Sequence, residues 1–166
     1  IPMINNTDSE KKSLSVNINK SVARHFCDAV WEYNIKRKKV YIYFDTLARD
    51  KENQWWNIDE LTEYFKNTTL VKTDFEIWDT YFNDGFLSAF IKNQNDEDEF
   101  YLRFNVGEND LQWHRILVEN QNSDTLIITG KNIYQEMQER SFYRTSENIF
   151  DRMMYIDVAT KHYIAH

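Results

Sequence analysis

Alternation of apolar and polar residues over residues 99–130 is the feature that most constrains the fold. Phe100, Leu102, Phe104 and Val106 alternate with Glu99, Tyr101, Arg103 and Asn105. After a turn at Gly107–Asp110, a second alternating run covers Leu111–Val118, and a third apolar run covers Thr125–Gly130. A period of two interrupted by short turns predicts three consecutive antiparallel strands.

An earlier stretch predicts a two-stranded hairpin. Ala29–Ile35 alternates with Ala29, Trp31, Tyr33 and Ile35 on one face, and Lys39–Asp45 is rich in β-branched and aromatic residues. The basic segment Lys36–Lys38 lies between the two runs and predicts the turn.

Helical signals fall between the hairpin and the three later strands. Asn57 followed by Glu60, and Thr73 followed by Glu76, are typical of capping boxes at helix starts. Gly85 is expected to end the second of these helices in a left-handed conformation. The predicted fold class is α+β: a five-stranded antiparallel sheet with short helices on one face, an N-terminal amphipathic helix and a C-terminal linker helix.

The amphipathic helix is predicted from a stripe with a spacing of four residues: Leu14, Ile18, Val22 and Phe26. This stripe is a candidate homodimer interface, because an apolar helix face needs a partner surface. We expect a loose lead-in over 1–13, a sensor domain over 14–133 and a linker helix over 134–150.

A short internal repeat indicates a further copy of the domain. Asp28–Ile35 is similar to Asp151–Val158, and both are followed by a short turn and a β-rich run. We interpret 151–166 as the truncated first hairpin of a second copy, with chance similarity of two strands as the alternative.

Composition narrows the functional classes. The formal net charge of −7 disfavours nonspecific nucleic-acid binding. A single cysteine, Cys27, excludes an internal disulfide or a thiolate zinc site and fits a reducing, cytoplasmic compartment. No apolar run has the length of about 18 residues that a membrane span needs, so no membrane contact is expected.

Several motifs together resemble a PAS domain of the kind common in bacterial diguanylate cyclases and sensor histidine kinases. Val30–Ile35 is similar to the family's opening strand, and Asp74 stands where the family often has an acidic helix start. Glu99–Phe104 and Leu111–Arg115 are similar to two later family strands, and Gly130–Ile133 to the closing motif. Within that closing motif, Asn132 stands where Asp is usual.

The resemblance implies a noncatalytic sensory and dimerisation module of a larger signalling protein. Its partners would be a second copy and a downstream output domain, with the signal passing through the exit helix. Neither cofactor of the family's light or haem sensors is expected. The family's flavin motif, which contains a reactive Cys, does not occur between Ile58 and Lys92. No His lies between His25 and His114 to serve as an axial haem ligand. No metal site is predicted either.

An aromatic-lined pocket for a small organic ligand is the expected site, with a dry packed core as the alternative. The residues expected to point inward are Trp31, Tyr33, Trp78, Phe90, Leu102, Phe104 and Trp113. Arg103 or Arg115 is expected to pair with a ligand carboxylate if either points inward.

Two other functions stay open. A small α+β enzyme or ligand carrier would use the aromatic cavity for its substrate and His114 as a base. A purely structural spacer would bind no ligand. The adjacent Trp55 and Trp56 predict either an exposed contact surface or packing around the helices.

Overall fold

One antiparallel sheet of six strands organises the part of the chain described by the computed structural model, residues 19–139. In spatial order the strands are β3, β2, β1, β6, β5 and β4. Their bounds are β1 Ala29–Asn34, β2 Lys39–Asp45, β3 Gln54–Trp56, β4 Glu97–Gly107, β5 Asp110–Asn122 and β6 Thr125–Asn132.

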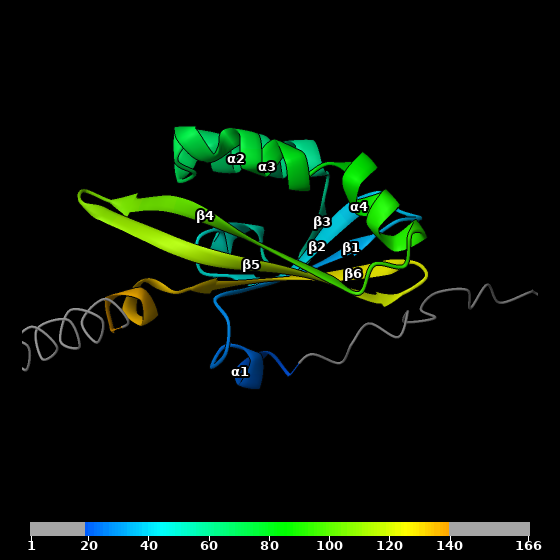
Figure 1. Ribbon diagram of the computed structural model, residues 1–166, viewed down its shortest axis with the longest axis horizontal. Helices are drawn as coiled ribbons and strands as arrows, with labels where there is room; N and C mark the ends of the chain where they lie inside the picture. Colours follow the sequence, from blue (N-terminus) through cyan, green and yellow to red (C-terminus); the bar gives the residue numbers. More distant parts are fainter. Residues whose placement is uncertain (1–18, 140–166) are drawn as a thin grey trace, which may run out of the picture.

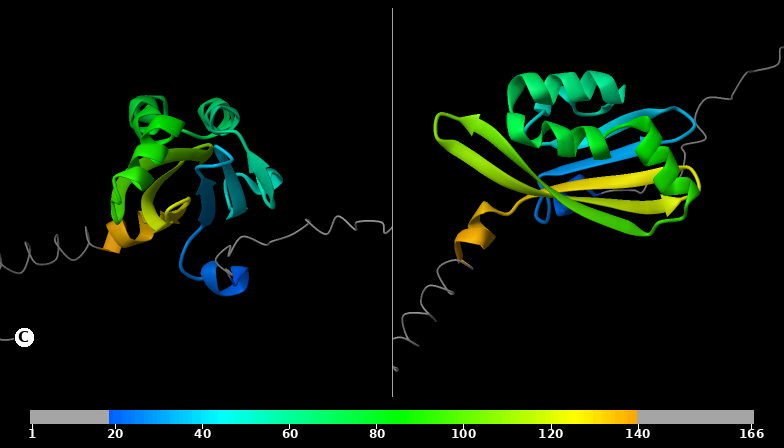
Figure 2. Two further views of the ribbon diagram at one scale, coloured as in Figure 1. Left: turned by 90° about the vertical axis from the view of Figure 1, so that its right-hand side faces the viewer. Right: turned by 45° about the horizontal axis from the view of Figure 1, so that its top comes forward.

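Three helices lie over one face of this sheet (Figures 1 and 2). They are α2 (Ile58–Thr68), α3 (Phe75–Tyr81) and α4 (Asp84–Lys92). The short helix α1 (Lys20–Ala23) lies on the opposite side of the sheet. Single 3₁₀ turns form η1 (Arg49–Lys51) and η2 (Lys72–Asp74), and residues 134–139 are helical. The α+β class with helices on one main face is therefore confirmed.

Pairing of β1 with β6 joins the first hairpin to the three later strands. Ala29 pairs with Gly130 across this junction, and the register continues to Asn34 opposite Thr125. Both faces of β1 are buried at this central position: Tyr33 points toward the helices, and Glu32 is 3% exposed on the other side. The predicted hairpin and the three later strands therefore form one continuous sheet.

The expected number of five strands is wrong, because β3 adds a sixth at the edge beside β2. Trp55 pairs with Tyr41 in this short ladder. The Trp56 indole N–H donates a 2.8 Å hydrogen bond to the carbonyl of Lys51, and the Lys51 ammonium lies 4.7 Å from the Trp56 ring centroid. Both tryptophans are half-buried, and they pack within the edge strand and against its neighbouring loop.

The helix starts follow local side-chain chemistry. Asn57 precedes α2, and its backbone N–H donates to Glu60 Oε2 at 3.3 Å, as expected for a capping box. The capping box expected at Thr73 and Glu76 is wrong: α3 begins after Asp74, which makes no side-chain cap hydrogen bond, and Thr73 lies in η2. The role expected for Gly85 is wrong: Gly85 lies inside the first turn of α4 without a positive φ, and Asn83 caps that helix through a 2.7 Å bond from the Phe86 N–H.

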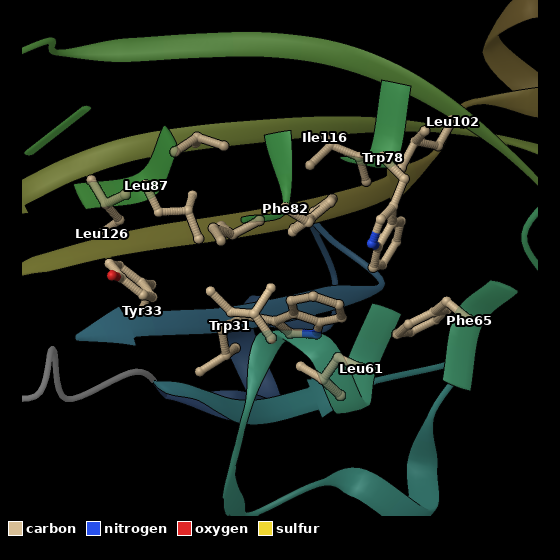
Figure 3. Close-up of a cluster of buried hydrophobic side chains, with 14 of the residues drawn as sticks. Trp31, Tyr33, Leu61, Phe65, Trp78, Phe82, Leu87, Leu102, Ile116 and Leu126 are labelled. Carbon is tan, nitrogen blue, oxygen red and sulfur yellow. The ribbon is translucent and has the colours of Figure 1, made fainter. Parts of the chain in front are cut away.

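An aromatic core fills the space between the helices and the sheet (Figure 3). The Trp31 ring lies 5.6 Å from the rings of both Phe65 and Phe82, and Trp78 lies 4.2 Å from Phe82, between ring centroids. Because each large aromatic side chain buries about 150–250 Å², this cluster accounts for much of the apolar burial on the helix side.

The described part of the N-terminal stripe is exposed. Val22 is 51% and Phe26 71% exposed, while Ala23 and Cys27 pack against Val30 and its neighbours on the face opposite α2, α3 and α4. Leu14 and Ile18, the segment 1–13, most of the linker helix 134–150 and the repeat 151–166 lie outside the described residues. Within 19–139, no helix has the length and apolar character needed to cross a membrane.

Candidate functional site

A small cavity lies where the aromatic core meets the end of the central strands. Its volume is about 30 Å³, which is room for one or two water molecules. Five aromatic side chains contribute to its lining: Trp31, Phe65, Trp78, Phe82 and Phe104. The other lining residues are Ala29, Asp45, Thr46, Leu47, His114, Ile116, Ile128 and Gly130.

The structure brings together some of the residues predicted to bind a ligand. Trp31, Trp78 and Phe104 line the cavity. Tyr33, Phe90 and Leu102 belong to the same hydrophobic core but lie outside the cavity lining. Figure 3 shows Trp31 of β1 and Trp78 of α3 together with Phe82, the residue that follows α3. The prediction of an aromatic interior therefore holds, while the free space within it is small.

Trp113 and Arg115 do not point inward as predicted. His114, Ile116 and Val118 are the buried residues of β5, so Trp113 and Arg115 lie on the face away from the helices. Trp113 is half-buried there, with the Arg103 guanidinium 5.1 Å from its ring centroid.

Arg103 is engaged in a structural ion pair. Its guanidinium bonds the buried carboxylate of Asp74, and its backbone N–H donates to Asp74 Oδ2 at 2.8 Å. Burial opposes the charged form of Asp74, but these hydrogen bonds outweigh burial and hold the pKa of the carboxyl below its ordinary value. The pair ties η2 to the outer edge of β4. Arg103 therefore has its own carboxylate partner, and neither predicted arginine faces the cavity.

Asp45, which ends β2, is a buried carboxyl group at the cavity. Its side chain accepts a 2.9 Å hydrogen bond from the Trp31 indole N–H and a 2.8 Å bond from the backbone N–H of Leu47. The residue is 3% exposed. Burial raises its pKa to about 7, because removal from water disfavours the charged form more than the hydrogen bonds favour it.

His114 is the second buried ionisable group in the cavity lining. Its ring lies 5.0 Å from Phe104 in an edge-on arrangement, and its Nε2 is 3.1 Å from Gln112 Oε1. Burial lowers its pKa to about 4, with a smaller opposing effect from Asp28. The imidazole is therefore neutral at pH 7, and the cavity carries an acid and a base whose pKa values are shifted toward their uncharged forms.

Sequence reasoning did not identify Asp45 as a site residue. An acidic residue at the end of a strand usually faces solvent in a turn, and no motif around Asp45 indicated otherwise. The available signal was the proximity of Trp31 and Asp45 across a predicted hairpin, since a buried indole N–H needs an acceptor.

Asp28, which precedes β1, links the start of β1 to the end of β6 beside this cavity. Its backbone N–H donates to Gly130 O at 2.8 Å, and its carbonyl accepts a 3.0 Å bond from the N–H of Thr46. Its carboxylate accepts a 2.7 Å bond from the N–H of Asn132. Asn132 in turn accepts a 2.9 Å bond from the N–H of Tyr134, so the Asn at this position orders the start of helix 134–139.

Among residues 19–139, no group of three or more His, Cys, Asp or Glu side chains is arranged to hold a metal ion. Comparison of the sequence with protein-family models and with curated proteins finds no match.

Proposed function

We propose that this chain is a noncatalytic sensory and dimerisation module of a bacterial signal-transduction protein, as its resemblance to PAS domains implies. The observation that carries the proposal is the position of the cavity. It contains two buried ionisable groups, Asp45 and His114. Its lining also includes Ala29 and Gly130, which lie where β1 pairs with β6, the first and last strands of the described residues. The cavity therefore lies beside the segment that enters β1 and the segment that leaves β6, so a change in the cavity acts close to both.

The arrangement of elements supports the sensor class. The resemblance depended on the first hairpin lying beside the later strands in one sheet, with short helices over one face. The six-stranded sheet satisfies this condition, with β3 as an addition. We further propose that Asn132 and the helix 134–139 begin the route to a downstream output domain in a cytoplasmic protein.

The volume of the cavity limits which ligand can bind without a movement of the helices. About 30 Å³ accommodates water, whereas an organic ligand needs several times that space. Such a ligand would bind only when the side chains of α2 and α3 that close the core move away from the sheet. Binding would then select a different packing of the helices, which is how a ligand shifts a conformational equilibrium.

The exposed pair Val22 and Phe26 supports self-association through the N-terminal stripe. Replacement of both by Ser is expected to convert a dimer to a monomer in light-scattering chromatography. Ile77→Ser, which changes a 38% exposed residue on α3, is the matched control and is expected to leave the mass unchanged. A monomeric wild-type chain would remove the dimerisation part of the proposal.

An enzyme or carrier that uses His114 as a base is the second candidate. The position of the imidazole at the cavity wall favours this function, because a base must reach its substrate. The pKa of about 4 opposes it, since such an imidazole is a weak base at neutral pH. The small cavity volume opposes it, since a substrate needs room beside the imidazole. We expect His114→Ala to change no turnover, and loss of a measurable turnover in that variant would favour the enzyme.

Ligand binding is tested by native mass spectrometry of the purified chain, followed by a small-molecule screen by thermal unfolding. We expect a compound that raises the melting temperature and slows hydrogen exchange in residues 134–139. Exchange in this helix is the decisive readout, because a passive carrier would gain stability without transmitting it. If no compound changes either quantity and the chain is monomeric, the structural spacer is the favoured function.

A further inference from the structure

Glu52 connects the cavity to the helix on the other side of the sheet. Its Oε1 accepts a 3.1 Å hydrogen bond from the backbone N–H of Asp45. Its Oε2 lies 3.3 Å from Nη2 of Arg24, the residue that follows α1. The Glu52 side chain is 18% exposed, and the Arg24 side chain is 54% exposed. One side chain therefore contacts both Asp45 and the α1 segment.

The α1 segment makes two further contacts with the same region. The Arg24 guanidinium lies 5.1 Å from the ring centroid of Phe44, the residue before Asp45. The Lys20 ammonium donates to Asn53 Oδ1, next to Glu52 in the chain. The α1 segment is therefore attached to the β2–β3 connection at both of its ends, by Lys20 and by Arg24.

The side chain of Asp45 contacts the cavity, whereas its backbone N–H contacts Glu52. Its carboxyl group holds the Trp31 indole N–H in the core and the backbone N–H of Leu47, and both of these residues line the cavity. Any displacement of Trp31 or Leu47 thus acts on the residue whose backbone N–H bonds Glu52.

We propose that Glu52 is a positioning residue that couples the cavity to α1. A rearrangement at the Trp31–Asp45 end of the cavity changes how firmly α1 is held, and release of α1 changes the environment of Trp31. The two effects are reciprocal, because a coupling free energy between two sites acts equally in both directions. The inference deepens the proposed function by adding the N-terminal side of the module as a second route for the signal.

The first test changes Arg24 and Glu52 and measures the effect on Trp31 in the core. Arg24→Gln and Glu52→Gln alter exposed or partly exposed side chains, so both variants keep the core intact. An ion pair of this kind contributes about 0.2–1 kcal/mol, which corresponds to roughly a 1.4- to fivefold faster hydrogen exchange in residues 20–27. The decisive readout is the NMR resonance of the Trp31 indole N–H, which contacts neither mutated side chain. We expect both variants to shift it.

Lys36→Gln is the matched control. It breaks the exposed ion pair with Asp124 at the opposite end of the hairpin, and it is expected to leave the Trp31 resonance and the 20–27 exchange unchanged. If Arg24→Gln and Glu52→Gln also leave the Trp31 resonance unchanged, the proposed coupling is wrong. If Lys36→Gln shifts it equally, the effect is not specific to Glu52, and the proposal is likewise wrong.

The second test introduces Asp45→Asn in the cavity wall and measures the effect on the α1 segment. This variant is expected to accelerate exchange in residues 20–27 in the wild-type background. It should have no additional effect in the Glu52→Gln background, because the ion pair between Glu52 and Arg24 is already lost there. Additive effects would overturn the inference. Coupling observed in a chain for which no ligand is found would support the inference while removing the proposed ligand sensing, so the two failures are distinguishable.

Discussion

The indole N–H of Trp31 donates a 2.9 Å hydrogen bond to the carboxyl group of Asp45 inside the aromatic core. The two residues come from paired strands, and both line the cavity. This bond satisfies a buried donor and gives the carboxyl group one of its two side-chain hydrogen bonds. The core is consequently an aromatic cluster with one ionisable acceptor fixed in place.

Asp45→Asn is expected to change how stability depends on pH. The folded-state pKa of Asp45 is raised to about 7 from 3.8, so the stability it contributes is present below the unfolded value and lost as pH rises through 7. Relative to wild type, Asp45→Asn should gain roughly 2–4 kcal/mol between pH 4 and pH 8. Urea unfolding over this range measures the difference.

The control for this experiment is Asp50→Asn. Asp50 is a nearby carboxyl group whose side chain is 61% exposed and whose pKa is lowered by Lys51. Its unfolding free energy should run parallel to that of wild type from pH 5 to pH 8. A parallel curve for Asp45→Asn over the same range would show that Asp45 is not held in a site that disfavours its charge.

His114→Gln is expected to have the opposite pH dependence. The pKa of the buried imidazole is lowered to about 4 from 6.5, so its contribution is present above pH 6.5 and lost as pH falls through 4. Wild type should lose roughly 2–3 kcal/mol relative to the variant over this interval. The same unfolding titration, with exposed His25→Gln as the control, measures it. An unchanged difference between pH 4 and 7 would contradict the burial of His114.

Asp74→Asn is expected to destabilise the fold by about 2–4 kcal/mol at pH 7, because it leaves the Arg103 guanidinium without its buried counter-charge. The matched control is Asp79→Asn, which breaks the 2.5 Å ion pair with Lys66 at a side chain that is 55% exposed. The control should cost at most about 1 kcal/mol. Equal costs in thermal or urea unfolding would mean that the Arg103–Asp74 pair is no stronger than a surface pair.

Asn83→Ala is expected to cost about 1 kcal/mol, the usual contribution of a helix N-cap. The substitution removes the side-chain oxygen that accepts the Phe86 N–H at 2.7 Å. Asn93→Ala at the other end of α4 is the control, since Asn93 caps that end through its backbone N–H. Local hydrogen exchange in residues 84–88 should rise in Asn83→Ala alone. A larger effect of Asn93→Ala would contradict the assignment of the cap.

Long alternating runs made most of the sheet predictable. Phe100, Leu102 and Phe104 alternate with polar residues, and they lie on the helix-facing side of β4 as expected. The capping residues before α2 were equally informative, because a local side-chain bond determines where that helix begins. In these segments the local preference and the final packing agree.

The orientation of β5 was not predictable from its alternation. Leu111, Trp113 and Leu117 form one apolar set, and Ile116 and Val118 form another of similar size. Tertiary packing selected the second set together with His114, and Trp113 instead lies beside the Arg103 guanidinium. The edge strand β3 was missed because three residues are too few to show an alternating pattern. Its position depends instead on the pairing of Trp55 with Tyr41 and on the hydrogen bond from Trp56 to Lys51.

The candidate site was predictable only in its apolar part. Aromatic residues at core positions indicated the cavity walls, but the burial of Asp45 and His114 depends on which residues surround them in three dimensions. Polar residues at the end or in the middle of a strand give no local sign of that environment.

Pairing of Ala29 with Gly130 brings the start of β1 and the end of β6 together in one hydrogen-bonded ladder. A short loop would therefore bridge them without crossing the molecule, and the unit is suited to circular permutation. For the same reason we expect that the unit tolerates insertion into a surface loop of a host protein, because its entry and exit points lie close together.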